Sequence, residues 1–314
     1  MSPRRFALLA VLLAAAFTAQ LAPASAARLQ IGISDQSPHV FANRLFKPLA
    51  VRYARIVVPW NVAQRHDYWP GYLNAWLAGA RKAHVQPHVA FGDPTYTIKH
   101  GPSPARYRAA FRTFRRRWPS VRVFTPWNEA TYHLAPTYRY PRLAARYYGV
   151  MKRTCGRCQI VAADVLDLPN LEGWLKKFLR YVPGHPRLWG VHNYRDANHN
   201  RPLRRSWTLK LTRMLKGTIW VTESGGIAGL EGARKKKPAY SYSPARAARS
   251  LKHLFVLVSS PRVRHRYRRV YVYNFFGSWD RHHHTNRWDS GLIGLNGKPR
   301  PAYWDLKGII RRLG

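Results

Sequence analysis

The chain has 314 residues, of which 54 are Lys or Arg and 13 are Asp or Glu, and its formal net charge is +41. A chain of this length can bury a large core without disulfide support, which excludes a small disulfide-framed scaffold. The positive charge bears on partners and solubility rather than on the fold. Carboxylates are scarce, so their positions are informative.

The N-terminus predicts a secretory signal peptide. Two arginines precede an apolar segment at 6–17, and Ala24-Ser25-Ala26 has the small-x-small pattern that signal peptidases cut. A membrane anchor is the alternative, but the apolar run is shorter than the roughly 20 residues of a spanning helix. We expect residues 1–26 to be removed and residues 27–314 to form one secreted catalytic domain. Charged residues interrupt every later apolar stretch, so no transmembrane segment is expected in the mature chain.

Cys155 and Cys158 are the two cysteines of the chain, and they lie in the sequence Thr-Cys-Gly-Arg-Cys. This spacing suits a redox pair, half of a zinc site or a small local disulfide. A zinc site would need a second pair of cysteines, and an exported protein meets oxidising conditions. A local disulfide is therefore the preferred prediction.

Apolar runs and amphipathic segments alternate along the rest of the chain. Eight apolar runs predict strands covered on both faces, at 29–34, 55–60, 87–91, 121–130, 159–165, 188–194, 218–222 and 269–276. Helical spacing or an initial Ser-Pro pair predicts helices at 37–50, 68–83, 103–118, 140–152, 171–181, 206–215, 243–258 and 302–313. This alternation predicts an α/β fold, a single (β/α)8 TIM barrel, with an open sheet as the alternative.

Most of the acids follow a predicted strand. In barrels of this kind the catalytic groups lie at the C-terminal ends of the strands. Turn and cap chemistry explains Asp at the start of a loop, but it does not explain Glu. Eight acids are expected at this rim, namely Asp35, Asp93, Glu129, Asp164, Asp167, Asp196, Glu223 and Asp280.

Glu129 and Glu223 are the notable members of this set, because the chain has only four Glu residues. They end the fourth and seventh predicted strands, which lie across the barrel from one another. Two carboxyl groups that face each other across a sugar are the requirement for cleaving a glycosidic bond, and a separation of roughly 5 to 5.5 Å corresponds to a retaining mechanism.

Four motifs at strand ends form a set: Trp127-Asn128-Glu129, His192-Asn193-Tyr194, Thr222-Glu223, and an aromatic segment followed by Trp279. The set resembles the clan A glycoside hydrolases, retaining (β/α)8 enzymes that include many cellulases, mannanases and β-xylosidases. The resemblance covers nearly the whole mature chain in element order. It implies that Glu129 is the general acid/base and that Glu223 is the nucleophile forming a glycosyl-enzyme intermediate. Ala130 and Ser224 depart from the residues common at these positions, so no subfamily is assigned.

The same resemblance implies roles for residues around the two glutamates. Asn128 would hydrogen-bond the sugar 2-hydroxyl, and Tyr194 would hold the nucleophile through its phenol. His192 would line the subsite for the glycone, and its alternative role is that of a buried histidine. Trp279 resembles the platform on which a sugar ring stacks.

Arg55, Trp60 and Asp93 are further candidates for the substrate-binding site, near the second and third predicted strands. Arg55 lies inside an apolar run, and a buried arginine needs a partner. We expect it to donate to Glu223 and to keep that carboxyl ionised, since a neighbouring cation lowers a carboxyl pKa. Trp60 and Trp127 have an alternative role as core aromatics.

The sequence thus predicts a secreted, monomeric, retaining β-glycosidase that acts on a polysaccharide or oligosaccharide without a cofactor. A non-catalytic barrel that binds anionic polymers, cell-wall polysaccharide or nucleic acid, through basic runs such as 234–237 and 262–269 is the alternative. Contact with nucleic acid would then be nonspecific. The tract at 282–284 has three adjacent histidines, which do not converge readily on one ion, so no metal site is predicted. Acids at strand ends favour the enzyme.

Overall fold

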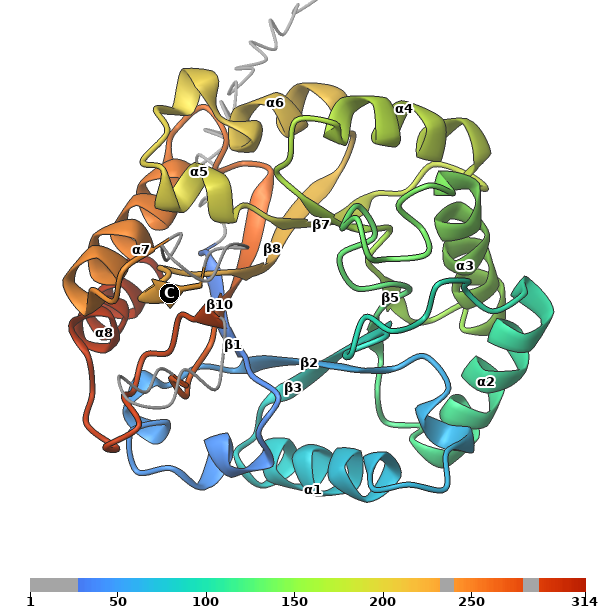
Figure 1. Cartoon of the computed structure of the whole chain (residues 1–314), viewed down its shortest axis with the longest axis horizontal. Coiled ribbons are helices and arrows are strands. Elements are labelled where there is room, and N and C mark those ends of the chain that lie inside the picture. Colours follow the sequence, from blue (N-terminus) through green and yellow to red (C-terminus); the bar gives the residue numbers. More distant parts are fainter. Residues whose placement is uncertain (1–27, 232–239, 279–287) are drawn as a thin grey trace, which may run out of the picture.

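The computed structural model describes residues 28–231, 240–278 and 288–314. Several sequence predictions lie outside this part of the chain: the signal peptide, the basic run at 234–237, Trp279, the rim residue Asp280 and the histidines at 282–284. Within the described part, nine strands form one parallel sheet that curls into a barrel, and helices surround it in chain order (Figure 1). The strand order is β5-β4-β3-β2-β1-β10-β8-β7-β6.

The strands of this sheet lie close to their predicted places. They are β1 (Gln30–Ser34), β2 (Tyr53–Pro59), β3 (Gln86–Gly92), β4 (Val123–Thr125), β5 (Gln159–Ile160), β6 (Asp164–Leu166), β7 (Leu188–His192), β8 (Thr218–Ser224) and β10 (Tyr267–Tyr273). The fourth strand is shorter than predicted, because the chain turns at Pro126, which cannot donate a ladder hydrogen bond. A separate antiparallel pair joins β9 (Gly229–Leu230) to β11 (Trp288–Asp289).

The fifth barrel strand consists of two short pieces. β5 pairs with β4 and β6 pairs with β7, and residues 161–163 connect the pieces. The connecting residues keep hydrogen bonds to both sides, since Val161 N donates to Phe124 O and Ala162 N donates to Leu188 O, each at 2.8 Å. Nine strands therefore occupy eight barrel positions, and the predicted TIM barrel is confirmed.

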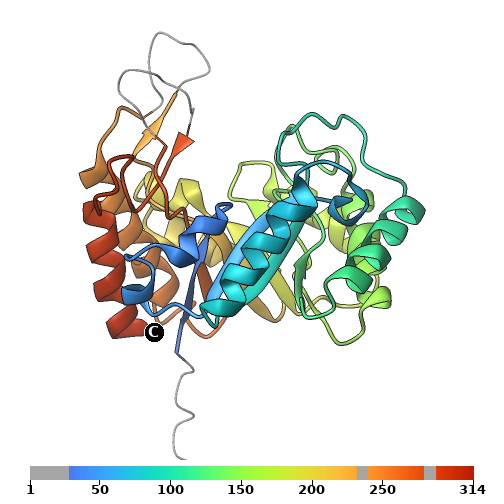
Figure 2. The same ribbon diagram turned by 90° about the horizontal axis from the view of Figure 1, so that it is seen from below.

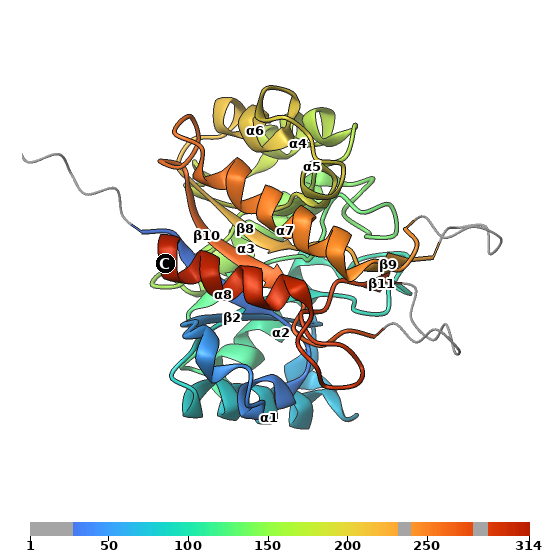
Figure 3. The same ribbon diagram turned by 90° about the vertical axis from the view of Figure 1, so that its left-hand side faces the viewer.

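Seven α-helices coincide with predicted helices: α1 (Trp69–Lys82), α2 (Pro104–Arg117), α3 (Pro141–Thr154), α4 (Leu171–Tyr181), α6 (Trp207–Met214), α7 (Pro244–Ser259) and α8 (Pro301–Leu313). Figure 2 shows α1 across the outer side of the barrel, and Figure 3 shows α7 beside α8. α2 and α7 begin with a Ser-Pro pair, and the serine caps the helix as expected. Ser103 Oγ and Ser243 Oγ accept from backbone N–H groups three residues further on, at 3.3 and 3.2 Å. No helix in the described part of the chain has the length and hydrophobicity to span a bilayer.

The predicted helix at 37–50 is wrong. Two 3-10 turns stand there instead, η1 (Pro38–Ala42) and η2 (Lys47–Leu49). The Asn43 side chain accepts from Leu45 N at 2.9 Å, a local bond that competes with helix formation, and Pro48 disfavours helical backbone before it. The other short segments are η3 (Val62–Gln64), η4 (Leu203–Arg205) and α5 (Tyr194–Asn198), which begins where the sixth strand was predicted to continue.

The core lies between the sheet and the helices, with a smaller cluster inside the barrel. Phe91, Phe111, Phe114 and Phe124 are fully buried, and they meet edge to face at centroid distances of 5.1 to 6.4 Å. Inside the barrel, the smaller cluster holds Val123, Val161, Trp220 and Tyr271. Burial on both strand faces explains why the strands were apolar throughout.

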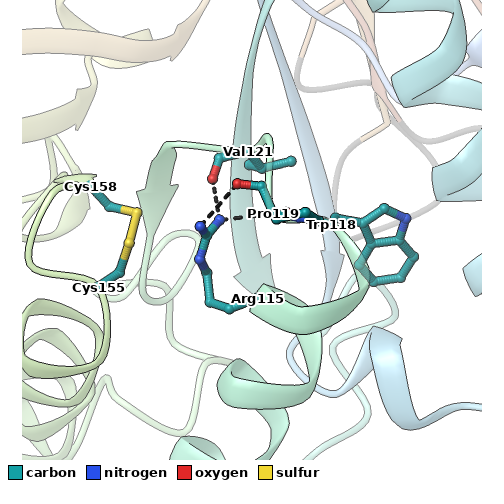
Figure 4. Close-up of a disulfide and its surroundings, with 6 residues drawn as sticks. All are labelled: Arg115, Trp118, Pro119, Val121, Cys155 and Cys158. Carbon is teal, nitrogen blue, oxygen red and sulfur yellow. Dashed lines mark hydrogen bonds between the residues drawn. A yellow bond between two sulfur atoms is a disulfide. The ribbon is translucent and has the colours of Figure 1, made fainter.

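A disulfide joins Cys155 and Cys158, whose Cα atoms are 5.4 Å apart, in the turn from α3 to β5. Figure 4 shows this disulfide and, at the neighbouring turn from α2 to β4, Arg115 donating to the carbonyls of Trp118, Pro119 and Val121. The contact to Pro119 O is 3.0 Å. Both turns are thus tied at the end of the barrel opposite the C-terminal ends of the strands.

Candidate active site

Glu129 and Glu223 meet at the C-terminal ends of β4 and β8. A carboxylate oxygen from each, together with a ring nitrogen of His192, forms a group whose atoms all lie within 4.8 Å of one another. The side chains of Glu129 and Glu223 are 15% and 11% exposed, whereas those of Arg55, Asp164 and His192 are fully buried. The two carboxyl groups are therefore the accessible part of a buried polar cluster.

Arg55, in the middle of β2, connects this cluster. Its Nη1 donates to Glu223 Oε2 at 2.8 Å and to Ser34 Oγ at 3.3 Å. Its Nη2 donates to Asn128 Oδ1 and to Asp164 Oδ2, both at 2.6 Å. The predicted contact with Glu223 is present, but the guanidinium lies beneath the carboxyl groups. Arg55 thus supports Glu223, and its direct contact with substrate stays a prediction.

Asp164 and His192 form the rest of the buried layer. Asp164 begins β6, where it accepts from Arg55 and, at 3.4 Å, from Thr125 Oγ1. Burial would raise the pKa of Asp164, but the charge of Arg55 and the nearby His192 hold it well below its usual value. His192 lies between two carboxylates, with Nδ1 3.3 Å from Glu129 Oε1 and Nε2 3.6 Å from Asp164 Oδ2.

The surroundings of His192 favour its charged form. Burial lowers the pKa of this imidazole, but the charges of Glu223 and Asp164 and the contact with Glu129 raise it to about 9 overall. The Glu129–His192–Glu223 group also has the donor atoms of a metal site, because a metal ion would displace the proton of the imidazole. The side chain of His192 is fully buried, and its expected place at the glycone subsite stays a prediction.

Tyr96 lies against the Glu129 carboxyl from the loop after β3. Its Oη donates to Glu129 Oε2 at 2.6 Å and accepts from Asn128 Nδ2 at 3.4 Å. Glu129 and Tyr96 both have positive φ, 48° and 54°, a backbone region that non-glycine residues rarely adopt. Such strain persists where the surroundings enforce it, which is common at functional sites.

Tyr194 lies against the other carboxyl. Its Oη donates to Glu223 Oε1 at 3.2 Å, the contact that the sequence led us to expect. The phenol is placed by α5, whose first N–H groups, those of Arg195 and Asp196, donate to the Asp167 carboxylate at 3.0 and 2.6 Å. The Trp288 indole packs edge-on against the Tyr194 ring, with centroids 4.9 Å apart.

The surroundings shift the pKa values of the two glutamates in opposite directions. Burial raises the pKa of Glu223, and the charges of His192 and Arg55 offset this only in part. Burial also acts on Glu129, but its bonds with His192 and Tyr96 lower its pKa overall. Arg55 therefore does not keep Glu223 more ionised than usual, because desolvation outweighs its charge.

Trp60 and Asp93 were expected to bind substrate, and the structure gives them other surroundings. Trp60 is 8% exposed, belongs to the hydrophobic core and stacks on Tyr107 at 6.4 Å. Asp93 uses its carboxylate within its own loop, accepting from Thr95 N at 3.2 Å and Ile98 N at 2.7 Å. Trp60 therefore packs in the core and Asp93 closes its loop, and a contact of either residue with substrate stays a prediction.

Comparisons with known proteins bear on the fold. No protein-family model matches the chain, and no curated protein is significantly similar to it in sequence. Among solved structures, a family 39 glycoside hydrolase of Bacteroides cellulosilyticus is similar with a TM-score of 0.60 and 16% identity, over 90% of this chain and 64% of that one. This chain thus spans less than two thirds of that enzyme.

Two further structures match over most of both chains. A family 10 endoxylanase from a sugarcane soil metagenome has a TM-score of 0.61 and 13% identity, covering 90% of this chain and 97% of that one. A family 5, subfamily 18, structure from Streptomyces cattleya has a TM-score of 0.61 and 15% identity, covering 91% and 80%. The chain has the (β/α)8 fold found in the glycoside hydrolases of these clan A families.

Proposed function

We propose that this protein is a secreted glycoside hydrolase that cleaves β-glycosidic bonds with retention of configuration. The observation that carries the proposal is the approach of the Glu129 and Glu223 carboxylates to within 4.8 Å at the C-terminal ends of β4 and β8. Retaining enzymes have a carboxyl separation of roughly 5 to 5.5 Å, whereas inverting enzymes need roughly 6.5 to 9.5 Å to admit a water molecule.

The first step joins the sugar to the protein. Glu223 attacks the anomeric carbon while Glu129 gives a proton to the departing glycosidic oxygen. The Arg55 and Tyr194 donors, at 2.8 and 3.2 Å, hold the Glu223 carboxylate in one orientation. Glu129 must be protonated at this step, although its bonds with His192 and Tyr96 favour its ionised form.

The second step releases the sugar. The ester removes the negative charge of Glu223, and with it a charge that raises the pKa of the neighbouring carboxyl. Glu129 is then the stronger acid, stays ionised and takes the proton from the attacking water. The bonds from His192 and Tyr96, which lower the pKa of Glu129, favour this half of the cycle.

For the substrate, we propose a β-linked polysaccharide or its oligomers. One similar structure is described as an endoxylanase, which makes xylan the first polymer to try. The aromatic surface for a sugar ring is then Trp288, because its partly exposed indole lies against Tyr194 and follows the eighth barrel strand, as Trp279 does. Export rests on the N-terminal pattern of arginines, apolar residues and Ala24-Ser25-Ala26.

The test is hydrolysis of aryl β-glycosides and xylan by the parent, Glu129→Gln and Glu223→Gln. Each variant should lose turnover by a factor of at least about 1,000 while it keeps the parent's circular dichroism spectrum. Glu172→Gln is the matched control, because Glu172 lies on the exposed side of α4 and pairs with Lys176 and Lys210. Parent-like rates in either site variant, or a parent inactive across a panel of β-glucans, xylans, mannans and arabinans, would refute the proposal.

A further inference from the structure

A basic pocket of about 920 Å³ lies at the N-terminal end of the barrel, away from the candidate active site. Its walls come from the first residues of β1, β5, β7, β8 and β10, together with the end of α3 and the turn after α4. Six arginine and lysine side chains of the described part of the chain line it, and no described carboxylate does: Arg28, Lys152, Arg153, Arg187, Arg268 and Arg269.

Arg269 is the buried member of this set. It is 4% exposed, and its guanidinium carbon lies 3.8 Å from the ring centroid of Tyr53 and 4.0 Å from that of Trp220. Its Nε donates to Gln30 Oε1 at 2.7 Å and its Nη1 to Tyr271 Oη at 3.1 Å. Neutral acceptors and aromatic faces thus hold this guanidinium in one orientation at the wall of the pocket.

The charge of Arg269 is compensated differently from that of the other buried arginines. Arg55 pairs with Asp164 and Glu223, and Arg300 pairs with Asp289 at 2.7 Å. Among the described carboxylates, none pairs with Arg269. A buried cation without an anionic partner is costly, and five further cations around the same space add to the positive potential. A bound anion would offset the charge of Arg269 and lower the positive potential of the pocket.

The lining residues indicate the kind of anion. Arginine predominates, and its planar fork matches the paired oxygens of phosphate groups. The volume lies in the range of ligand sites, roughly 300 to 1,000 Å³, and far exceeds that of one phosphate ion. Single-stranded nucleic acids need aromatic faces for base stacking. Here Tyr148 and Trp220 are both buried, and Arg269 covers Trp220.

We propose that this pocket binds a linear polyanion whose phosphate groups repeat along the chain, and that arginine side chains recognise these groups through paired contacts with the phosphate oxygens. The site lies at the opposite end of the barrel from Glu129 and Glu223, so a bound polymer leaves the catalytic end open. A phosphate-rich surface would thereby retain the protein with its catalytic end facing away. This inference stands whether or not the protein hydrolyses glycosides.

The test compares two variants with the same change in net charge. Arg153→Glu/Arg187→Glu reverses two exposed cations of the pocket, and Arg108→Glu/Arg112→Glu reverses two exposed cations on α2, outside it. Affinity for long-chain inorganic polyphosphate is measured by calorimetry at several salt concentrations, with orthophosphate, polygalacturonate and single-stranded DNA as comparison ligands. The pocket variant should bind polyphosphate at least about tenfold more weakly than the parent, and the α2 variant within about threefold.

Three results would overturn the proposal. Equal weakening in both variants would mean that binding is spread over the surface. Binding of polygalacturonate or single-stranded DNA as tight as that of polyphosphate, and equally sensitive to the pocket variant, would mean that phosphate is not the feature recognised. A parent that does not bind polyphosphate would exclude the site. Parent-like glycoside hydrolysis is expected in both variants, so this test is separate from that of the active site.

Discussion

Arg55 and Glu223 form a buried ion pair of 2.8 Å between β2 and β8, although 168 positions separate them in the chain. Nη2 of Arg55 contacts Asn128 and Asp164, and Nη1 also contacts Ser34. One side chain therefore holds groups from β1, β6 and β8 and from the end of β4. Such a planar, two-pronged contact requires arginine rather than lysine.

Arg55→Lys should therefore lower kcat by about 100-fold, because the ammonium cannot hold Glu223 and Asp164 together. It should also lower the free energy of unfolding by about 3 kcal/mol, since one buried carboxylate loses its partner. Denaturant unfolding and steady-state kinetics check both. Arg300→Lys is the control: its pairing with Asp289 is also buried, so stability should fall while kcat stays near that of the parent. Parent-like kcat in Arg55→Lys would contradict this role.

His192 should control the basic limb of the pH–activity profile. Its charge and its contact with Glu129 lower the pKa of that carboxyl, so removing them lets Glu129 remain protonated to higher pH. In His192→Gln, the basic limb of kcat/KM should move upward by about one pH unit. His88→Gln serves as the control, because His88 is also buried but contacts Thr125. A limb that stays in place or moves downward would exclude this coupling.

Trp288→Ala distinguishes two roles of this indole: a surface on which a sugar ring stacks, and a support for the Tyr194 ring. Loss of a stacking surface should raise KM by about tenfold and leave kcat within about threefold, because the interaction is the same in the bound substrate and in the transition state. The control is Trp304→Ala, at an indole that is 56% exposed on α8. A fall in kcat with unchanged KM would show that Trp288 acts only by holding Tyr194 against Glu223.

The disulfide should contribute modestly to stability and nothing to activity. Cys155 and Cys158 are three positions apart, and loop-closure entropy for so short a loop amounts to about 2 kcal/mol at most. Cys155→Ser/Cys158→Ser should unfold at correspondingly lower denaturant concentration and hydrolyse substrate like the parent. Loss of turnover in the double variant, with its fold intact, would show that the turn after α3 influences the active site.

The sequence predicted the barrel well because strands buried on both faces are mostly apolar, and the apolar runs of β4 and β8 can be recognised from the local sequence. It also placed Glu129 and Glu223 at one rim, since every parallel strand ends on the same side. The helix at 37–50 failed because the pairing of Asn43 with Leu45 N outweighs a weak Ser-Pro signal.

The missing parts of the site depend on contacts that sequence patterns do not contain. Asp164 was predicted at the rim, but the sequence also contains a sign that it is buried. It lies inside the apolar run 159–165, where it could have been matched with the arginine inside the run 55–60. Tyr96 reaches Glu129 only because its loop closes on Asp93. The opposite pKa shifts of the two glutamates depend on burial and on charges from several strands, which no local motif reports.

The central claim is that Glu129 and Glu223 act on opposite sides of one glycosidic bond with Glu223 as nucleophile. Anomeric-proton NMR during hydrolysis of a β-linked oligosaccharide tests it most directly, because it identifies the first-formed product before mutarotation. We predict the β-anomer, as double displacement through a glycosyl-enzyme ester requires. An α-anomer appearing first would mean that water attacks directly, which contradicts the account.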